Sequence, residues 1–166
     1  MNLRILFVDD SPDDVDLMLG RLRESGIEAQ WERVQTEAAL REALSGRHWE
    51  LALVDYNLPS FGGFEALGLL AELAPDVPAV TVTGAISEET AAATIAAGAV
   101  DYVLKDNLTR LASAARRAVE GAALRLRQRH AAAQARQTQF AIDHSSQMIA
   151  YVSRDGTILY LSLIHI

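Results

Sequence analysis

The chain has no cysteine among its 166 residues, which excludes disulfides and thiolate metal sites. It also has no long hydrophobic run, since no stretch approaches the roughly 20 apolar residues of a membrane-spanning helix. The first apolar segment, residues 3–8, stops at two aspartates, which is not the pattern of a signal peptide. These absences favour a cytoplasmic protein without a membrane span.

The chain has few positively charged residues: it contains 15 Lys and Arg and 22 Asp and Glu, which gives a formal net charge of -7. This balance argues against a nucleic-acid partner for the whole chain. The basic residues gather in residues 116–136, where Glu120 is the single acid. We interpret that stretch as a solvated helix face rather than a membrane or nucleic-acid contact.

Strand-like and helix-like segments alternate over about 120 residues. Half of the residues are apolar, enough for the core of one full domain and part of another. Ser11 followed by Pro12 predicts the start of the first helix. Alternation of this kind predicts a parallel α/β sheet with right-handed crossovers. The expected strands are 3–8, 29–34, 51–54, 79–82 and 101–104, and the expected helices begin near residues 12, 36, 64, 87 and 107.

Polar residues follow four of these apolar runs. Asp9 and Asp10 follow the first, Asp55 the third, Thr83 the fourth and Lys105 the fifth. Because the carboxyl ends of parallel strands lie along one edge of the sheet, these side chains are expected to converge. Three acids, a hydroxyl and an ammonium together predict a site for a divalent cation and a phosphoryl group.

Four motifs close these apolar strands. They are Phe7-Val8-Asp9-Asp10-Ser11, Val54-Asp55-Tyr56-Asn57-Leu58-Pro59, Val82-Thr83-Gly84 and Tyr102-Val103-Leu104-Lys105. Taken together, they resemble the receiver domain of two-component response regulators, over roughly residues 1–121. The resemblance implies an α/β fold, a flavodoxin-like (βα)5 doubly wound parallel sheet of order 2-1-3-4-5, here with a C-terminal helical extension. It implies phosphorelay signalling rather than an enzyme.

The same resemblance implies that Asp55 is the phospho-acceptor for a sensor histidine kinase or a histidine phosphotransfer protein. It implies Mg²⁺ as cofactor, because a bare carboxylate and a phosphoryl group repel each other. The direct ligands would be Asp10, Asp55 and the backbone carbonyl of Asn57. Asp9 would bind the ion through water.

Further roles follow from the resemblance. Lys105 would contact the phosphoryl oxygens, Thr83 would be the switch hydroxyl, and Tyr102 the switch aromatic. Gly84 would leave the path of attack open. Simpler roles remain for some: Asp9 or Asp10 as a helix cap, Thr83 as an ordinary strand end, and Tyr102 as a packed aromatic. Asp106 departs from the family, which usually has proline after the lysine.

Residues 107–141 are expected to form a fifth helix that continues into a linker or signalling helix. From Leu108 to Phe140 there is no proline, and apolar residues keep the 4-3 spacing of a coiled coil with Arg129 and Arg136 in the seam. Two alternatives stay open: a helix that forms a homodimer, or a solvated linker.

Residues 140–160 resemble the opening of a PAS domain, with a hairpin whose turn would be Asp155-Gly156. A lone hairpin buries too little surface to be stable alone. Residues 161–166 are expected to be a sequencing or truncation scar.

Two other functions compete with the phosphorelay receiver. An aspartate-based, Mg²⁺-dependent phosphohydrolase also needs acids at strand ends, but it spaces its nucleophile and acid two residues apart and adds a cap domain. Here Asp9 and Asp10 are adjacent, and the length leaves no room for a cap. A receiver-like binding module that is never phosphorylated would have lost Asp55, Lys105 or an acid of the pair, and all are present.

Overall fold

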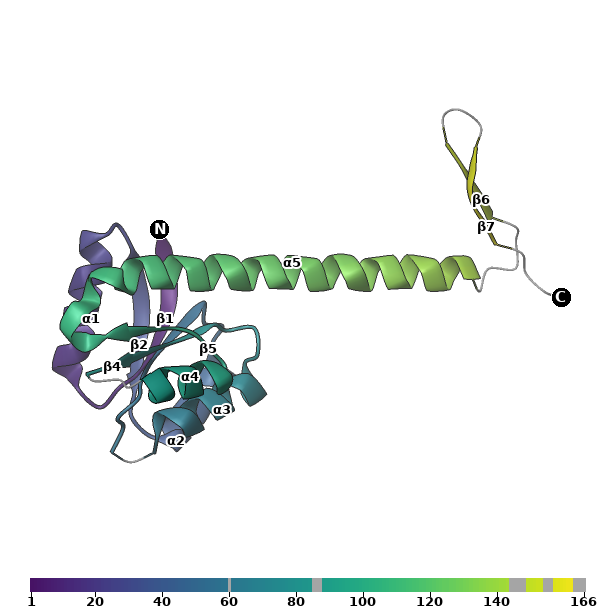
Figure 1. Ribbon diagram of the computed structural model, residues 1–166. Helices are drawn as coiled ribbons and strands as arrows, with labels where there is room; N and C mark the ends of the chain where they lie inside the picture. Colours follow the sequence, from purple (N-terminus) through teal and green to yellow (C-terminus); the bar gives the residue numbers. More distant parts are fainter. Residues whose placement is uncertain (60, 85–87, 144–148, 154–156, 163–166) are drawn as a thin grey trace. The chain divides into compact units, whose positions relative to one another are not determined.

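The structure is a computed structural model that describes residues 1–59, 61–84, 88–143, 149–153 and 157–162 (Figure 1). The chain divides into two compact units, Met1–Ala123 and Leu124–Ile166. Three predicted features lie wholly or partly outside the described residues. They are the expected start of the fourth helix near residue 87, the Asp155-Gly156 turn and most of the expected scar, residues 163–166.

The first unit contains a five-stranded parallel sheet whose strand order is β2-β1-β3-β4-β5, as predicted. Each expected strand is present, although β5 begins two residues earlier than the pattern indicated. β3 lies at the centre and is buried at all five positions, which explains its continuous apolar run. The strands are β1 (Asn2–Val8), β2 (Glu28–Val34), β3 (Leu51–Asp55), β4 (Ala79–Thr83) and β5 (Ala99–Leu104).

The two faces of the sheet carry separate apolar clusters, because successive side chains of a strand point to opposite sides. Ile5 and Phe7 of β1 pack with α1 (Pro12–Glu24) and the first turns of α5 (Leu111–Asp143). Leu6 and Val8 point to the other face, where they pack with α2 (Glu37–Gly46) and α3 (Gly63–Leu73). These two helices lie on the opposite side of the sheet from α5 (Figure 1). Helix α4 (Glu88–Ala96) connects β4 to β5.

Helix α1 begins where the sequence predicts. The Ser11 hydroxyl accepts the backbone N–H of Asp14 at 3.2 Å, and Pro12 occupies the first helical position. After the helix, Gly26 adopts a φ of 75°, a left-handed conformation that favours glycine. The first strand and the first helix are therefore joined by a short, capped turn, and this turn carries Asp9 and Asp10.

The start of the fifth helix differs from the prediction. Residues Lys105–Arg110 form a 3-10 segment, η1, and the α-helix begins at Leu111 rather than near Asn107. Asn107 is the reason, since its backbone (φ -138°, ψ 67°) is not helical, and the Thr109 hydroxyl donates to its side-chain oxygen. Leu108 of η1 is buried in the same apolar cluster as Ile5 and Phe7, so the segment is anchored in the core of the first unit.

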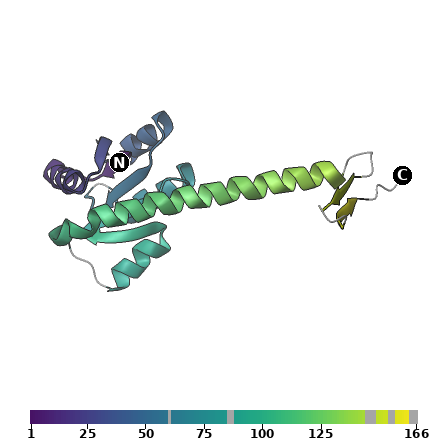
Figure 2. The same cartoon turned by 90° about the horizontal axis from the view of Figure 1, so that it is seen from above.

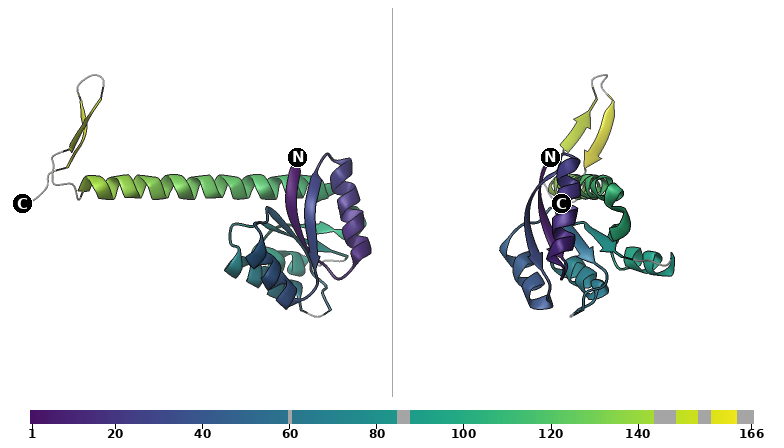
Figure 3. Two further views of the ribbon diagram at one scale, coloured as in Figure 1. Left: turned by 180° about the vertical axis from the view of Figure 1, so that it is seen from behind. Right: turned by 90° about the vertical axis from the view of Figure 1, so that its left-hand side faces the viewer.

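Helix α5 runs without a break from Leu111 to Asp143 (Figure 2). Its last residues lie in the second unit, together with an antiparallel pair of strands, β6 (Ile149–Val152) and β7 (Ile158–Ser162), which lie side by side in Figure 3. Within the described parts of the chain, no helix combines the length and hydrophobicity needed to cross a bilayer.

Gly63, the first residue of α3, lies against the backbone that carries Asp55. A Cβ atom there would be 2.7 Å from the Cα of Tyr56 and 2.9 Å from the carbonyl oxygen of Asp55. We expect Gly63→Ala to lower the free energy of unfolding by about 2 kcal/mol, because backbone cannot move aside cheaply. Urea denaturation measures this difference.

Gly68 provides the matched control in the same helix. It has open space around its Cα, so Gly68→Ala is expected to stabilise the protein by about 0.5–1 kcal/mol. Equal effects of the two substitutions would contradict the close approach at Gly63.

Candidate functional site

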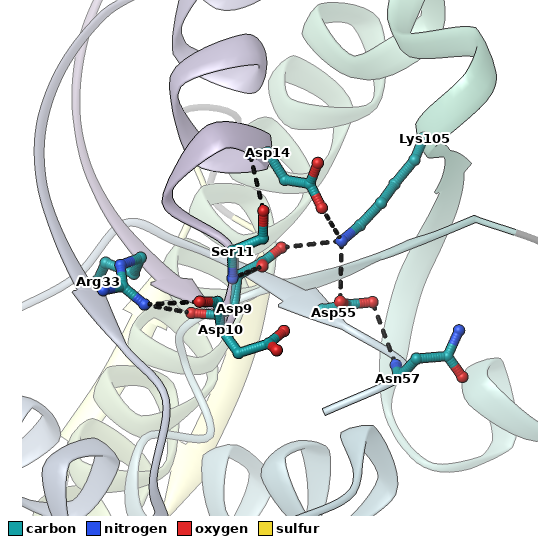
Figure 4. A network of polar contacts seen from close by, with 8 residues as sticks. All are labelled: Asp9, Asp10, Ser11, Asp14, Arg33, Asp55, Asn57 and Lys105. Atoms are coloured by element: carbon teal, nitrogen blue, oxygen red, sulfur yellow. Dashed lines mark hydrogen bonds and ion pairs between the residues drawn. The ribbon is translucent and has the colours of Figure 1, made fainter. Parts of the chain in front are cut away.

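The carboxyl ends of the strands bring the predicted acids and the lysine together. Asp9 follows β1, Asp55 ends β3 and Lys105 follows β5, and the three side chains meet in Figure 4. Asp9, Asp10 and Asp55 each offer an oxygen, and these three atoms lie within 4.8 Å of one another. Asp9 and Asp55 are buried, whereas Asp10 is exposed, so the group opens to solvent on the side of Asp10.

Lys105 is the centre of the polar network. Its Nζ donates to Oδ2 of Asp55 at 2.8 Å and to Oδ2 of Asp9 at 3.2 Å. A third acceptor, Oδ2 of Asp14, lies at 2.6 Å and comes from the first turn of α1 (Figure 4). The ammonium therefore joins the ends of β1, β3 and β5 to the start of α1.

The turn after β1 is held from both sides. The backbone N–H of Ser11 donates to Oδ1 of Asp9 at 2.8 Å, which fixes that buried carboxylate. Arg33, near the end of β2, donates from Nη1 to the carbonyl oxygens of Asp9 at 3.0 Å and Asp10 at 3.3 Å. Because Arg33 binds the backbone carbonyl oxygens of Asp9 and Asp10, it leaves the carboxylate oxygens of both residues available to the site.

The end of β3 contributes a second fixed carboxylate, that of Asp55. Oδ1 of Asp55 accepts the backbone N–H of Asn57 at 3.1 Å, and Asn57 itself is exposed. The N–H of Tyr56 donates to the carbonyl oxygen of Val82 at 3.2 Å. Both oxygens of Asp55 thus have a donor, one in the loop that follows β3 and the other Lys105.

Burial and neighbouring charges shift the pKa values of two groups in the site, Asp9 and Lys105. Burial raises the pKa of the Asp9 carboxyl, an effect that the Ser11 N–H and Lys105 only partly offset. Burial alone would lower the pKa of Lys105, but its hydrogen bonds to Asp14 and Asp55 raise it above the ordinary value of 10.5. Lys105 is therefore charged at neutral pH.

Three further predicted residues lie at the same end of β4 and β5. Thr83 is fully buried at the end of β4, one position beyond the pairing of Asp55 with Val82. Gly84 follows it and is exposed, and a Cβ atom added there would meet no other atom within 4 Å. Tyr102 is half-buried on β5, where it pairs with Thr81 rather than with Thr83.

Two residues of the network escaped prediction from the sequence. Asp14 lies in the first turn of the first helix and follows no apolar run, so the strand-end pattern gives it no role, although its side chain reaches Lys105. Arg33 lies within the expected strand 29–34 rather than after it, so the same pattern gives it no role either. The available signal for Arg33 was its place near the carboxyl end of β2, the same edge of the sheet at which the acids were expected.

The raised pKa of Asp9 gives a prediction about stability without metal. Between pH 3.8 and the raised value, the folded protein binds more protons than the unfolded chain, so stability falls as pH rises through this window. Asp9→Asn removes the buried charge and keeps an acceptor. We expect it to stabilise the metal-free protein at pH 7 by about 1 kcal/mol, or roughly 3–6 °C in melting temperature.

Thermal melts with a chelator, at several pH values, measure this gain. It should shrink as the pH is lowered, because the parent then becomes protonated at Asp9. Asp16→Asn on the exposed face of α1 is the control and should change the melting temperature little. A lower melting temperature for Asp9→Asn at pH 7 would contradict the prediction.

The sheet order and the acidic group with its lysine define a class of signalling domain. The sequence model of the response regulator receiver domain matches residues 5–116, and the chain belongs to this family. Receiver domains are signalling modules rather than classical enzymes, which disfavours the phosphohydrolase. They receive phosphoryl groups from histidine kinases and generally bind Mg²⁺ at an aspartate cluster.

Individual relatives agree with the family. The chain is 37% identical over 126 residues to the nitrogen assimilation regulatory protein NtrX of Azorhizobium caulinodans, covering 74% of this chain and 27% of NtrX. It is 33% identical over 128 residues to the response regulator PilR of Pseudomonas aeruginosa, covering 75% of this chain and 26% of PilR. The chain thus spans about a quarter of the length of these two relatives.

A solved structure agrees as well. The receiver domain of NtrX from Brucella abortus superposes with a TM-score of 0.62 at 31% identity, covering 70% of this chain and 98% of that domain. The chain is therefore a response regulator receiver domain in both fold and family.

Proposed function

We propose that Asp55 accepts a phosphoryl group from a sensor histidine kinase or a histidine phosphotransfer protein. The observation that carries this proposal is the hydrogen bond of 2.8 Å from Lys105 to the carboxylate of Asp55, which lies next to the carboxylates of Asp9 and Asp10. A buried carboxylate that is held by a cation is positioned for attack on an incoming phosphorus.

In the transfer, an oxygen of Asp55 forms a bond to phosphorus while the bond from phosphorus to the donor's imidazole nitrogen breaks. The electron pair of that bond stays on the imidazole, which leaves as a neutral ring because its other nitrogen already carries a proton in the donor, and the product is an aspartyl phosphate. Lys105 acts as a point charge that stabilises the phosphoryl oxygens as negative charge is rearranged on them.

We propose Mg²⁺ as the cofactor of this site. The proposed direct ligands are Asp10, Asp55 and the backbone carbonyl of Asn57, and Asp9 binds through water. The donor set fits the ion, since Mg²⁺ prefers oxygen ligands and keeps several waters, and the three carboxylates offer oxygens within 4.8 Å of one another. When bound, Mg²⁺ supplies positive charge that offsets the repulsion between carboxylate and phosphoryl group.

We propose that Thr83 and Tyr102 transmit the modification. Thr83 lies at the end of β4, next to the strand that carries Asp55, and its hydroxyl would bond the phosphoryl group. Tyr102 is half-buried and would turn inward when Thr83 moves. The space around the Cα of Gly84 is open, which would leave a path for the phosphoryl donor to reach Asp55. Thr83→Ala would then uncouple phosphorylation from any change at Tyr102, measured by NMR of the tyrosine ring.

We further propose the organisation of the rest of the chain. The receiver domain occupies residues 1–121, and residues 107–141 include the fifth helix and a linker or signalling helix. Residues 140–160 begin a PAS domain, a proposal supported by the β6–β7 hairpin and tested by the sequence of the full-length gene. The protein acts in the cytoplasm, as the absence of cysteine and the phosphohistidine donor suggest, and fractionation of cells tests this.

A homodimer through α5 is part of the proposal. Leu126 is a large apolar residue that is exposed on this helix and belongs to the 4-3 series, which continues past it. Leu124 is also exposed but lies outside that series. Arg129 and Arg136 in the seam would weaken such a dimer. Sedimentation equilibrium of the whole chain measures the association.

The experiment that tests the function uses acetyl phosphate as the donor. We expect an adduct of one phosphoryl group in the intact mass with Mg²⁺ and none with a chelator. Asp10→Asn should slow its formation on the order of a hundredfold, because a direct metal ligand is lost. Asp13→Asn, an equal change of charge three residues away, is the control. Formation without Mg²⁺, or at the parent's rate in Asp10→Asn, would contradict the metal assignment.

A further inference from the structure

All three hydrogens of the Lys105 ammonium are used. A lysine ammonium has three N–H donors and no acceptor. In this protein the three are directed to Asp9, Asp14 and Asp55, at 3.2, 2.6 and 2.8 Å. A phosphoryl oxygen that needs a hydrogen bond from Lys105 must therefore displace one of these acceptors.

The three acceptors differ in how easily they can be displaced. Asp9 is 1% exposed in its side chain, and Ser11 also holds it, so releasing it would leave a buried charge with fewer partners. Asp55 is the group to which phosphorus becomes attached. Asp14 has 37% of its side chain exposed, so water can replace the lysine there at little cost.

The shortest of the three bonds is nevertheless the one to Asp14. Its backbone is fixed in the first turn of α1 by the Ser11 hydroxyl, so its carboxylate faces Lys105 at 2.6 Å. This is a charge-assisted hydrogen bond, roughly twice as strong as a neutral one. Asp14 thus holds the ammonium in the unmodified protein and is also the partner most readily exchanged.

We propose that Asp14 is a positioning residue that competes with the phosphoryl group for Lys105. In the unmodified protein the ammonium is shared with Asp14. When Asp55 becomes phosphorylated, one N–H of Lys105 passes from Oδ2 of Asp14 to a phosphoryl oxygen, and water solvates the released carboxylate. This inference rests on the proposed function of Asp55, and it assigns to α1 a part in setting the rate of the reaction.

The competition affects the two directions of the reaction differently. Formation of the aspartyl phosphate starts with Lys105 bound to Asp14, so that bond must break before or during transfer. Hydrolysis starts with Lys105 already on the phosphoryl group, and Asp14 is solvated in both the starting state and the transition state. Weakening the bond to Asp14 should therefore speed formation and leave hydrolysis unchanged.

The experiment compares Asp14→Asn with the parent, using acetyl phosphate and Mg²⁺. The amide keeps the shape of the carboxylate but is a neutral acceptor. We expect formation to be about three to ten times faster, with the hydrolysis rate, measured after removal of the donor, within twofold of the parent. Asp14→Ala, which removes the acceptor, should show the same split, and thermal melts verify that both variants fold.

Asp13→Asn is the matched control. Asp13 is the neighbouring residue of α1, it is exposed, and its loss changes the net charge equally. Loss of one negative charge near the site could speed the reaction simply by weakening the repulsion of the anionic donor. In that case the adduct would form faster in both Asp13→Asn and Asp14→Asn. The proposed competition speeds its formation only in Asp14→Asn.

Two results would overturn the proposal. Slower formation in Asp14→Asn and Asp14→Ala would mean that Asp14 directs Lys105 toward Asp55 instead of withholding it. Formation no faster than in Asp13→Asn would mean that Asp14 does not compete. A parent that gives no adduct at all is a different failure, because it removes the proposed function of Asp55 and this inference with it.

Discussion

Asp55→Asn is expected to abolish phosphorylation of the chain by acetyl phosphate in the presence of Mg²⁺. An amide nitrogen or oxygen does not attack phosphorus under conditions in which a carboxylate does, so the loss should be complete within detection. Asparagine keeps the side-chain oxygen that accepts the N–H of Asn57, so the loop after β3 is expected to keep its shape. Intact mass gives the fraction of protein that carries the adduct.

Asp76 is the control for this experiment, and Asp10 is the residue most able to replace Asp55 as acceptor. Asp76, exposed in the loop between α3 and β4, precedes β4 and so lies at the other end of the sheet, and Asp76→Asn should be phosphorylated at the parent's rate. Asp10 is the exposed acid of the group and the most accessible rival to Asp55. An adduct that persists in Asp55→Asn and still requires Mg²⁺ would place the acceptor elsewhere, with Asp10 the first residue to map.

The sheet was predictable because burial leaves a direct mark on sequence. Strands covered by helices on both faces are continuous apolar runs, as at Leu51–Val54, and the polar residue after each run marks the edge at which a site forms. This rule alone predicts the convergence of Asp9, Asp55 and Lys105, and no knowledge of side-chain directions is needed.

The rest of the network depends on side-chain directions that spacing does not encode. Asp14 is the third residue of a capped helix, and an acid there is favoured by the helix dipole whether or not it reaches a lysine. Arg33 belongs to an edge strand, where polar residues are ordinary. The 3-10 start of the fifth helix depends on the backbone of Asn107, a residue that the family resemblance gave no reason to treat as a break.

The two units are expected to differ greatly in hydrogen exchange. Amides of Val80–Thr83 lie in β4, between β3 and β5, and all positions of this strand are buried. They should exchange only on global unfolding, at least about 10⁴ times slower than an unstructured chain. Amides of Ile149–Val152 and Ile158–Ser162 should show protection of about tenfold or less, because a two-stranded hairpin is marginal in water.

A shortened chain separates the receiver from the remainder. Residues 1–123 contain all five strands of the sheet, so a protein ending at Ala123 should keep the protection of β4 within about tenfold. Comparable protection in β4 and in β6–β7 of the whole chain would contradict the prediction. It would mean that the hairpin is stabilised by docking or by pairing between chains, and dependence of its protection on protein concentration would separate these two cases.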